Sequence, residues 1–129
     1  MTTCIFCSLP PENIILQNEL AVAIYDKYPV NPGHVLVIPK RHFPTFFEAT
    51  DAEVLAVYDL IRKARELLEA KFHPDGYNIG VNNGACAGQT VWHMHVHVIP
   101  RFVGDVDHPR GGVRRVKPNL AVAPAEEGR

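Results

Sequence analysis

Three histidines alternate with apolar residues in the run His93-Met94-His95-Val96-His97-Val98-Ile99-Pro100. Successive side chains of a strand point to opposite faces, so a strand here would place all three imidazoles on one face. Imidazoles spaced about 7 Å apart can act on one substrate group or serve two adjacent sites. The histidines could ligate a metal, or one could attack an electrophile while its neighbours supply protons and positive charge. The spacing alone does not choose between these two chemistries.

The segment just before these histidines is rich in groups that suit a phosphate. It supplies backbone N–H groups, side-chain amides and a hydroxyl, from Asn82, Gly84, Gly88, Gln89 and Thr90. Backbone N–H groups in such turns form concave anion sites and stabilise negative charge that develops during a reaction. A glycine-rich loop by itself is often an ordinary turn. Its position directly before a histidine face strengthens the interpretation as a phosphate site.

Cys4 and Cys7 form a Cys-x-x-Cys pair, whereas Cys86 lies in the glycine-rich loop. The pair could be a redox centre, half of a structural zinc site or two unrelated small apolar residues. A thioredoxin-like redox pair lies at the junction of a strand and a helix in a βαβ unit, and this N-terminus has no such pattern. We therefore favour a metal site, which needs two further ligands, and expect no role for Cys86.

These groups need a framework, which the hydrophobic pattern predicts. Short strands are predicted over 13–17, 20–25, 34–38, 77–82 and 91–99, between turns rich in glycine, proline and asparagine. Pro39 is expected to end the third strand. Thr50 and Glu53 form a capping box, and the apolar spacing that follows predicts one long amphipathic helix from Asp51 to Phe72. Strands around one dominant helix indicate the α+β class with a mostly antiparallel sheet.

The chain has 129 residues, 47% of them hydrophobic and 21% charged, which suits a single domain. We predict a domain over 1–117 and a flexible tail over 118–129. A net charge of −1 lacks the positive field of nonspecific nucleic-acid binders, so we expect no nucleic-acid partner. The longest apolar run, 20–25, is far shorter than the roughly 20 residues of a spanning helix, and no signal segment is visible. We therefore expect no membrane partner and a cytoplasmic location.

The run from Asn82 to His97, read as Asn-x-Gly-x-x-x-Gly-Gln-Thr-Val-x-His-x-His-x-His, resembles the histidine triad (HIT) superfamily of nucleotide hydrolases and transferases. The segment from His34 to His42 is similar to that family's upstream strand and turn, so the resemblance extends from Cys4 to Arg101. It implies a HIT-like fold, in agreement with the predicted strands around one helix. It also implies a homodimer.

The resemblance implies a reaction at the α-phosphate of an adenine nucleotide. His95 would be the nucleophile and form a nucleotidyl-histidine, which water then hydrolyses. His97 would contact the phosphate, His34 would support the histidines, and Gln89 would hold the leaving group. One transferase branch of the family has glutamine in place of the third histidine, so His97 favours a hydrolase.

The resemblance also implies a set of nucleotide-binding residues. Asp26 would bind the ribose hydroxyls, although a single Asp at a strand end can equally be a solvated surface residue. The phosphate would be held by Asn82, Gly88, Gln89, Thr90 and His97. Apolar walls for the base could come from Ile24 and from Ile5 or Phe6, residue types that serve equally well in an ordinary core.

In relatives with this N-terminal cysteine pair, a zinc ion is completed by two histidines that correspond to His42 and His93. The resemblance therefore implies a closed, structural zinc site formed by Cys4, Cys7, His42 and His93. Such a site would tie the N-terminus to the segment that carries His95 and would not activate water. No organic cofactor is expected.

Two substrate classes stay open, diadenosine polyphosphates and adenosine phosphoramidates. The residues after the triad resemble bacterial members described as diadenosine-polyphosphate hydrolase-like, which makes that class the first hypothesis. A basic segment could neutralise a polyphosphate or be an ordinary solvated surface: Arg101, Arg110, Arg114, Arg115 and Lys117. The alternatives are a nucleotide-binding protein that acts through partners, and a metalloenzyme that uses the triad itself as its zinc site.

Overall fold

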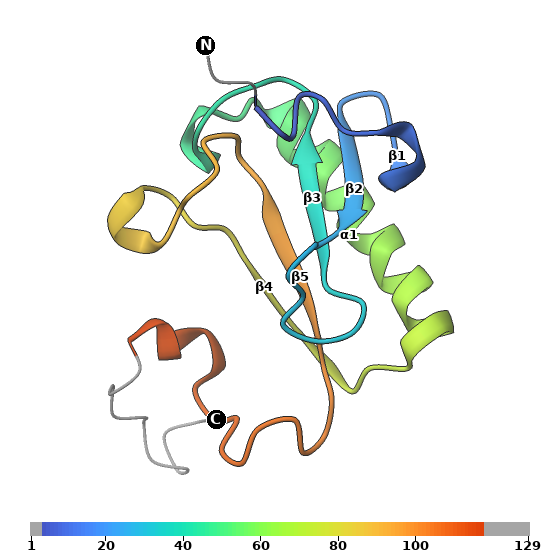
Figure 1. Ribbon diagram of the computed structural model, residues 1–129, viewed down its shortest axis with the longest axis vertical. Coiled ribbons are helices and arrows are strands. Elements are labelled where there is room, and N and C mark those ends of the chain that lie inside the picture. The colour runs from blue at the N-terminus through green and yellow to red at the C-terminus, as the bar shows by residue number, and fades with distance from the viewer. Residues whose placement is uncertain (1–3, 118–129) are drawn as a thin grey trace.

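The computed structural model describes residues 4–117, which form one antiparallel sheet with a long helix against it. The strands lie in the order β1-β2-β3-β5-β4 (Figure 1). Their bounds are Ile14–Gln17 for β1, Ala21–Tyr25 for β2, Val35–Pro39 for β3, Gly76–Gly80 for β4 and Val96–Arg101 for β5. The helix α1 spans Asp51–Phe72. The predicted α+β class and antiparallel sheet are therefore confirmed.

Helix α1 begins where its capping box predicts and has the bounds predicted from the capping box and the apolar spacing together. The Thr50 hydroxyl accepts a hydrogen bond from the backbone N–H of Glu53 at 3.1 Å, and the Glu53 carboxylate accepts one from the backbone N–H of Thr50 at 2.9 Å. These two bonds satisfy N–H groups that have no partner within the helix. His73 ends the helix in a left-handed conformation, with φ 52°.

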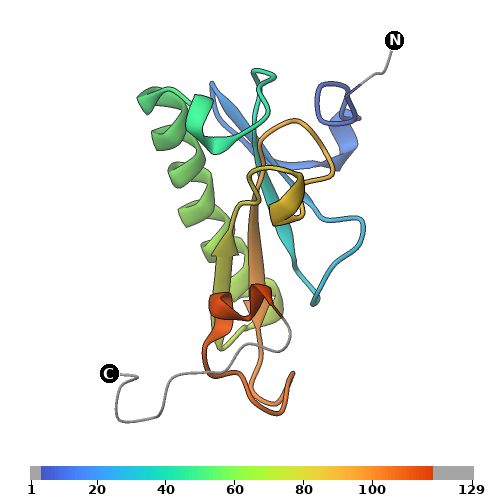
Figure 2. The same cartoon turned by 90° about the vertical axis from the view of Figure 1, so that its left-hand side faces the viewer.

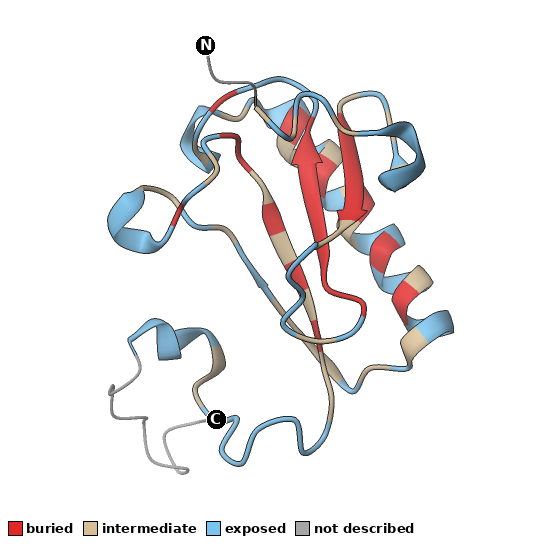
Figure 3. Ribbon diagram, in the orientation of Figure 1, coloured by how far each residue is buried: buried red, intermediate tan, exposed pale blue. Residues whose placement is uncertain are grey.

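Different segments of the chain cover the two faces of the sheet. Figure 2 shows α1 on one side and the N-terminal segment on the other. Under the helix lies the larger core, which includes Met94, Val96 and Val98. On the opposite face, a smaller buried cluster of Val22, Ile24, Leu36 and Ile38 is covered by Phe6, Leu9 and Ile14. Figure 3 accordingly shows buried residues along β2 and β3 and in one stripe of α1.

The last strand, β5, begins at Val96 rather than at residue 91 as predicted. The backbone N–H of Met94 donates to the carbonyl of Phe43 at 2.8 Å, so the chain just before β5 bonds to the loop after β3 instead of the sheet. His93 and His95 consequently lie on the approach to β5, and His97 lies within it. The predicted alternation persists, because Met94, Val96 and Val98 are all buried.

The bounds of the other four strands also differ from the prediction, by one or two residues. Strand β4 covers Gly76–Gly80 rather than 77–82, and Pro39 belongs to β3 as its last residue. Pro39 is tolerated because β5 pairs only with residues 35–37 of β3. The N–H of Lys40 points toward β2, where it donates to Leu20, so the missing N–H of Pro39 falls on the unpaired side.

Short 3₁₀ turns complete the described chain: η1 (Pro11–Asn13), η2 (Phe46–Glu48), η3 (Ala85–Ala87) and η4 (Gly112–Val116). The turn η4 lies in the segment that carries the basic residues Arg114 and Arg115. The tail predicted over 118–129 lies outside the described residues. Among the described helices, none combines the length and apolarity that crossing a membrane requires.

Candidate functional site

A cavity of about 1240 Å³ lies beside the N-terminal segment and opens onto β2, β3 and the histidines. One part of its lining is polar and includes Asp26, Asn82, Gly88, Gln89, Thr90, His95 and His97. Another part is apolar and includes Ile5, Phe6, Leu9, Ile15, Ile24 and Leu36. The cavity therefore brings together the phosphate-binding and base-binding residues that the sequence suggested.

His95 has one ring nitrogen committed to the backbone. Its Nδ1 lies 2.8 Å from the carbonyl oxygen of His93. A carbonyl only accepts hydrogen bonds, so Nδ1 carries the proton in this contact. In the neutral ring the lone pair is then on Nε2. A ring that lines the cavity with a free Nε2 lone pair has the form that a nucleophile needs.

His34 and His97 form a hydrogen-bonded pair at the cavity, in which His97 belongs to the lining and His34 is buried. The backbone N–H of Val30 donates to His34 Nδ1 at 2.9 Å, so this nitrogen is the acceptor and Nε2 of the neutral ring carries the proton. His34 Nε2 lies 3.0 Å from His97 Nδ1 and donates to it. The proton of neutral His97 is therefore on Nε2. His97 can donate a hydrogen bond from this nitrogen to a bound oxygen.

The surroundings keep both rings neutral. Burial, with the neighbouring His95 and His34 rings, lowers the pKa of His97 to about 4, and the Asp26 carboxylate offsets only part of this effect. Burial also lowers the pKa of His34, again against the opposing effect of Asp26. At neutral pH each ring therefore has one donor and one acceptor nitrogen, as the hydrogen-bonded pair requires.

Asp26 lies just after β2 with its two oxygens in different contacts. Oδ1 accepts a hydrogen bond from the backbone N–H of Tyr28 at 2.9 Å, and Oδ2 lies 3.4 Å from His34 Nε2 and 3.9 Å from His97 Nδ1. The ligand atoms of these three side chains are close enough to hold a metal ion. However, Val30 directs the proton of His34 onto Nε2, where a metal would have to bind. The hydrogen bonding thus disfavours a metal held by Asp26, His34 and His97.

The predicted phosphate loop is held in shape by Gln89. Its side chain is buried, with Oε1 accepting from the backbone N–H of Gly84 at 2.9 Å and Nε2 donating to the carbonyls of Pro44 and Val91. Its polar atoms thus brace the loop around η3, whereas the resemblance implied contact with a leaving group. Gly88 has φ 96°, a backbone conformation that favours glycine.

A second group of side chains meets next to the cavity. Cys4 Sγ and Cys7 Sγ lie 3.4 Å and 3.5 Å from His93 Nδ1. His42 Nδ1 lies 3.4 Å from Cys7 Sγ and 3.1 Å from His93 Nδ1. All four ligand atoms lie within 4.8 Å of one another. The four residues predicted as metal ligands therefore form one cluster.

The cluster has the donor set of a tetrahedral metal site, and its distances of 3.1 to 3.5 Å are close to the spacing of one. Ligand atoms around a four-coordinate zinc lie roughly 3.3 to 3.8 Å apart, given Zn–N and Zn–S bonds of about 2.1 and 2.3 Å. His93 Nε2 lies 2.7 Å from the carbonyl of Pro39, so it carries the ring proton and leaves Nδ1 free as a ligand. Burial lowers the pKa of His93, against the opposing effect of this hydrogen bond, which favours the neutral ring that a metal needs.

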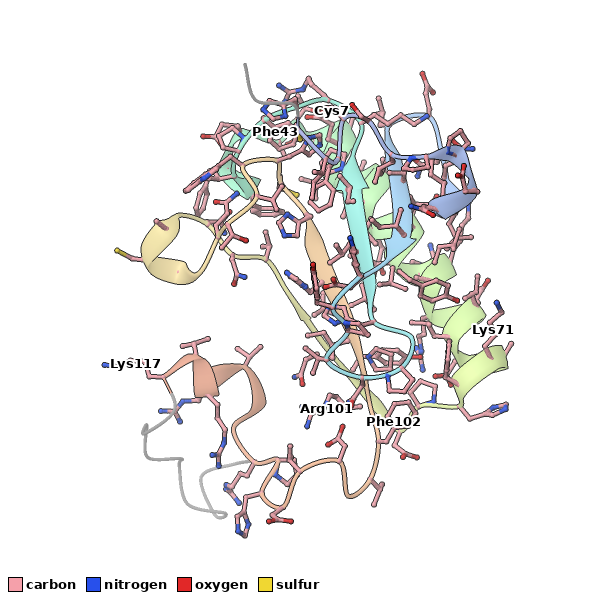
Figure 4. All side chains as sticks on the ribbon, in the orientation of Figure 1. Cys7, Phe43, Lys71, Arg101, Phe102 and Lys117 are labelled. Carbon is pink, nitrogen blue, oxygen red and sulfur yellow. The ribbon has the colours of Figure 1, made fainter. Side chains whose placement is uncertain are left out.

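The basic segment lies away from both sites. None of its five basic residues lines the large cavity. Figure 4 shows Arg101 and Lys117 far from Cys7, toward the opposite end of the molecule. Arg101 is instead bound to Asp105 through two hydrogen bonds of 2.8 Å and to Asn78 at 2.6 Å. Within one chain, therefore, this segment does not reach the candidate phosphate site.

Several groups that shape the site were missed by the sequence analysis. The N–H of Val30 and the carbonyls of Pro39 and His93 orient three imidazoles, and backbone groups have no signal in the sequence. Glu53 was recognised only as a helix cap, yet it also accepts two hydrogen bonds, of 2.8 and 2.9 Å, from Arg41, next to His42. The guanidinium lowers the pKa of Glu53 to about 2.

Comparisons with known proteins agree with this geometry. The family model described as the HIT domain matches residues 9–104. An uncharacterized HIT-like protein of Methanocaldococcus jannaschii is 42% identical over 106 residues, which cover 79% of this chain and 81% of that protein. The asymmetrical bis(5'-nucleosyl)-tetraphosphatase of Schizosaccharomyces pombe is 39% identical over 92 residues, 71% of this chain but only 50% of that protein.

A solved structure is similar in both fold and sequence. The crystal structure of a zinc-bound histidine triad family protein from Mycobacterium smegmatis has a TM-score of 0.73 and 34% identity to this chain, covering 80% of this chain and 78% of that one. The HIT-like fold implied by the sequence motifs is thereby confirmed. Because the family model matches most of its length and the relatives share its fold, the chain belongs to the HIT domain family.

Proposed function

We propose that this protein is a nucleotide hydrolase that cleaves dinucleoside polyphosphates at the α-phosphate of an adenine nucleotide. The observation that carries the proposal is the hydrogen bond from His95 Nδ1 to the His93 carbonyl, which places the lone pair of the neutral ring on Nε2 in a side chain that lines the cavity. A neutral imidazole with an available lone pair is a competent nucleophile toward phosphorus.

In the first step, Nε2 of His95 attacks the α-phosphorus, and the bond from phosphorus to the bridging oxygen breaks. The remaining phosphate chain leaves with the electron pair of that bond. Negative charge on the α-phosphate oxygens is stabilised by the Nε2–H of His97, which the Val30, His34 and His97 contacts keep in place. Thr90 and the backbone near Gly88 line the same part of the cavity and add further donors.

In the second step, water attacks the phosphorus of the nucleotidyl-histidine and the bond to His95 Nε2 breaks. The electron pair of that bond returns to Nε2, the proton of the water passes to solvent, and AMP leaves. Asp26 and Asn82 line the cavity as candidates for binding the ribose and the phosphate. The apolar residues Phe6, Ile24 and Leu36 would contact the base.

The size of the cavity and the names of relatives support the choice of substrate. Its volume of about 1240 Å³ exceeds the roughly 300 to 1,000 Å³ that is common for small-ligand sites, which suits a dinucleotide better than a mononucleotide. Besides the tetraphosphatase of S. pombe, the relatives include an AP-4-A phosphorylase of Mycobacterium tuberculosis, 35% identical over 95 residues. Adenosine phosphoramidates are the alternative substrate class.

We also propose that Cys4, Cys7, His42 and His93 hold a structural zinc ion. With four protein ligands such an ion has no open position for water and would stabilise the fold around the catalytic segment. The homodimer and the cytoplasmic location implied by the resemblance remain proposals, as does the absence of nucleic-acid and membrane partners.

The test is release of AMP from diadenosine tetraphosphate and from adenosine phosphoramidate, measured side by side with the wild-type protein and His95→Ala. We expect AMP from the wild-type protein, with faster turnover of the dinucleotide, and a loss of at least about a thousandfold in the variant, because the nucleophile is gone. In rapidly quenched samples, mass spectrometry should find one AMP group attached to the wild-type protein.

His108→Ala is a matched control, because His108 is exposed and does not line the cavity. This variant should retain full activity. Faster turnover of the phosphoramidate would shift the substrate class and leave the mechanism in place. If neither substrate yields AMP above the level of His95→Ala, the hydrolase proposal is wrong, and a nucleotide-binding protein becomes the better description.

A further inference from the structure

Phe6 lies between the two cysteines of the metal cluster. The N–H of Cys7 donates to the carbonyl of Cys4 at 3.2 Å, which closes a tight turn around Ile5 and Phe6. Both sulfurs of this turn point at His93. The position of the Phe6 side chain is therefore set by a turn whose two ends belong to the metal cluster.

The Phe6 ring contacts two histidines of the triad. Its centroid lies 5.0 Å from that of His95 at an interplanar angle of 68°, and 6.0 Å from that of His93 at 85°. Both are edge-to-face arrangements, which aromatic rings favour. On its other side Phe6 packs against the buried cluster that includes Ile24 and Leu36. The ring thus fills the space between the sheet and the imidazole of His95.

We propose that Phe6 is a positioning residue for His95 and that the metal cluster holds it in that position. The inference rests on the proposed function, in which His95 is the nucleophile, and adds a residue outside the triad that controls its orientation. It also gives the metal site a consequence for the reaction, although the metal itself never contacts the substrate.

The physical reason lies in how weakly a single hydrogen bond orients an imidazole. The bond from His95 Nδ1 to the His93 carbonyl leaves the ring able to tilt about its Cβ–Cγ bond. The Phe6 ring blocks that motion by contact and keeps water off that part of the imidazole. Because a displacement of 1 Å at a reacting atom can cost about a hundredfold in rate, such a contact affects catalysis directly.

The first experiment compares Phe6→Ala with Leu9→Ala in the metal-loaded protein, using diadenosine tetraphosphate. Leu9 is the matched control, because it lines the same cavity and packs on the same cluster, but it belongs to neither the metal cluster nor the aromatic contacts of His95. Both variants should raise KM, because each removes part of the apolar lining of the cavity. Only Phe6→Ala should also lower kcat, by about tenfold or more. Equal kcat in the two variants would overturn the proposal.

The second experiment observes the His95 ring without turnover. Long-range ¹H–¹⁵N spectra of the histidine side chains, assigned with His95→Gln, should show one tautomer in the wild-type protein, with the proton on Nδ1. In Phe6→Ala the His95 nitrogen shifts should move toward the average of two tautomers, whereas Leu9→Ala should keep the wild-type shifts. Unchanged His95 shifts in Phe6→Ala would contradict a positioning role.

The third experiment tests the connection to the metal. Cys7→Ser, or a chelator, should reproduce in the wild-type background the His95 shift changes of Phe6→Ala. In the Phe6→Ala background, loss of the metal should add little further change, because the same contact is already absent. Fully additive changes would show that the metal acts through His93 alone and would overturn the connection.

These measurements separate the inference from the function it rests on. If the wild-type protein releases no AMP from either substrate, the proposed function fails, and the kinetic comparison fails with it. The nitrogen shifts of His95 still show whether Phe6 orients this ring. If AMP is released and Phe6→Ala behaves like Leu9→Ala, the hydrolase proposal stands and the positioning role is wrong.

Discussion

The histidines of the site differ in the backbone group that each ring contacts. His34 Nδ1 accepts from the N–H of Val30, whereas His95 Nδ1 donates to the carbonyl of His93. These contacts select opposite tautomers in the two side chains. His97 then acquires its tautomer from His34. The chemical role of each ring is thus decided by neighbours that are mostly not side chains.

The lowered pKa of His97 predicts how stability depends on pH. Its pKa is about 4 in the folded protein against a reference value of 6.5, so between these pH values the unfolded chain binds the extra proton. The free energy of unfolding should therefore fall as the pH decreases from 6.5 toward 4. Since one pKa unit corresponds to about 1.4 kcal/mol, His97 alone should contribute a loss on the order of 1 to 2 kcal/mol between pH 7 and pH 5.

Urea unfolding at pH 7, 6 and 5 measures this loss, and comparison with His97→Gln isolates the contribution of the one ring. The variant should show a shallower decrease in stability toward low pH, because glutamine does not titrate. His108→Ala, which changes an exposed histidine, should follow the wild-type curve. Parallel curves for the wild-type protein and His97→Gln would contradict the lowered pKa.

At the scale of the elements, the turn before β3 packs against the end of α1. Gly33 has φ 87°, and a Cβ added there would lie 2.9 Å from Phe72 Cδ2 and 3.0 Å from Leu68 Cδ2. Immediately after this glycine comes His34, whose ring orients His97. The close approach of helix and turn therefore helps to set the position of the histidine pair.

Gly33→Ala should destabilise the protein by about 2 kcal/mol, because it combines a strained positive φ with contact against the helix. Gly76→Ala is the matched control, since a Cβ at Gly76 would have nothing within 4 Å and its φ lies outside the positive range. Chemical unfolding of both variants measures the difference. Equal stability of the two variants would show that the turn adjusts without cost.

At the scale of the whole molecule, the metal cluster joins three distant parts of the chain. Cys4 and Cys7 come from the N-terminal segment, His42 from the loop after β3, and His93 from the approach to β5. The N-terminal segment covers the sheet face that α1 leaves open (Figure 2). A metal ion in this cluster would therefore hold together the wall of the cavity and the segment that carries His95.

Metal analysis of the purified wild-type protein should find about one equivalent of zinc, and Cys4→Ser should lose it. Because a bound structural metal stabilises only the folded chain, removal by a chelator should lower the midpoint of thermal unfolding. Cys86→Ser is the control, since Cys86 is exposed in η3 and lies outside the cluster. A wild-type protein without metal would contradict the zinc site.

The sequence by itself determined the periodic and local features of this protein. The capping box at Thr50 and Glu53 and the apolar spacing that follows it predicted the bounds of α1 correctly, because helix caps act within one turn. The alternation around His95 placed apolar residues in the core and histidines opposite them, because a strand has a period of two. The spacing of the histidines left open whether they bind a metal or attack an electrophile.

The spacing of the histidines did not divide the triad between two sites; the family resemblance implied that division, and only the tertiary structure shows its physical cause. His93 turns to the cysteine cluster, whereas His95 and His97 face the cavity, because the chain before β5 bonds to the loop that carries His42 instead of continuing the sheet. The tautomers likewise depend on the N–H of Val30 and on the carbonyls of His93 and Pro39. Every residue has such backbone groups, so the sequence does not distinguish the few that folding brings against an imidazole.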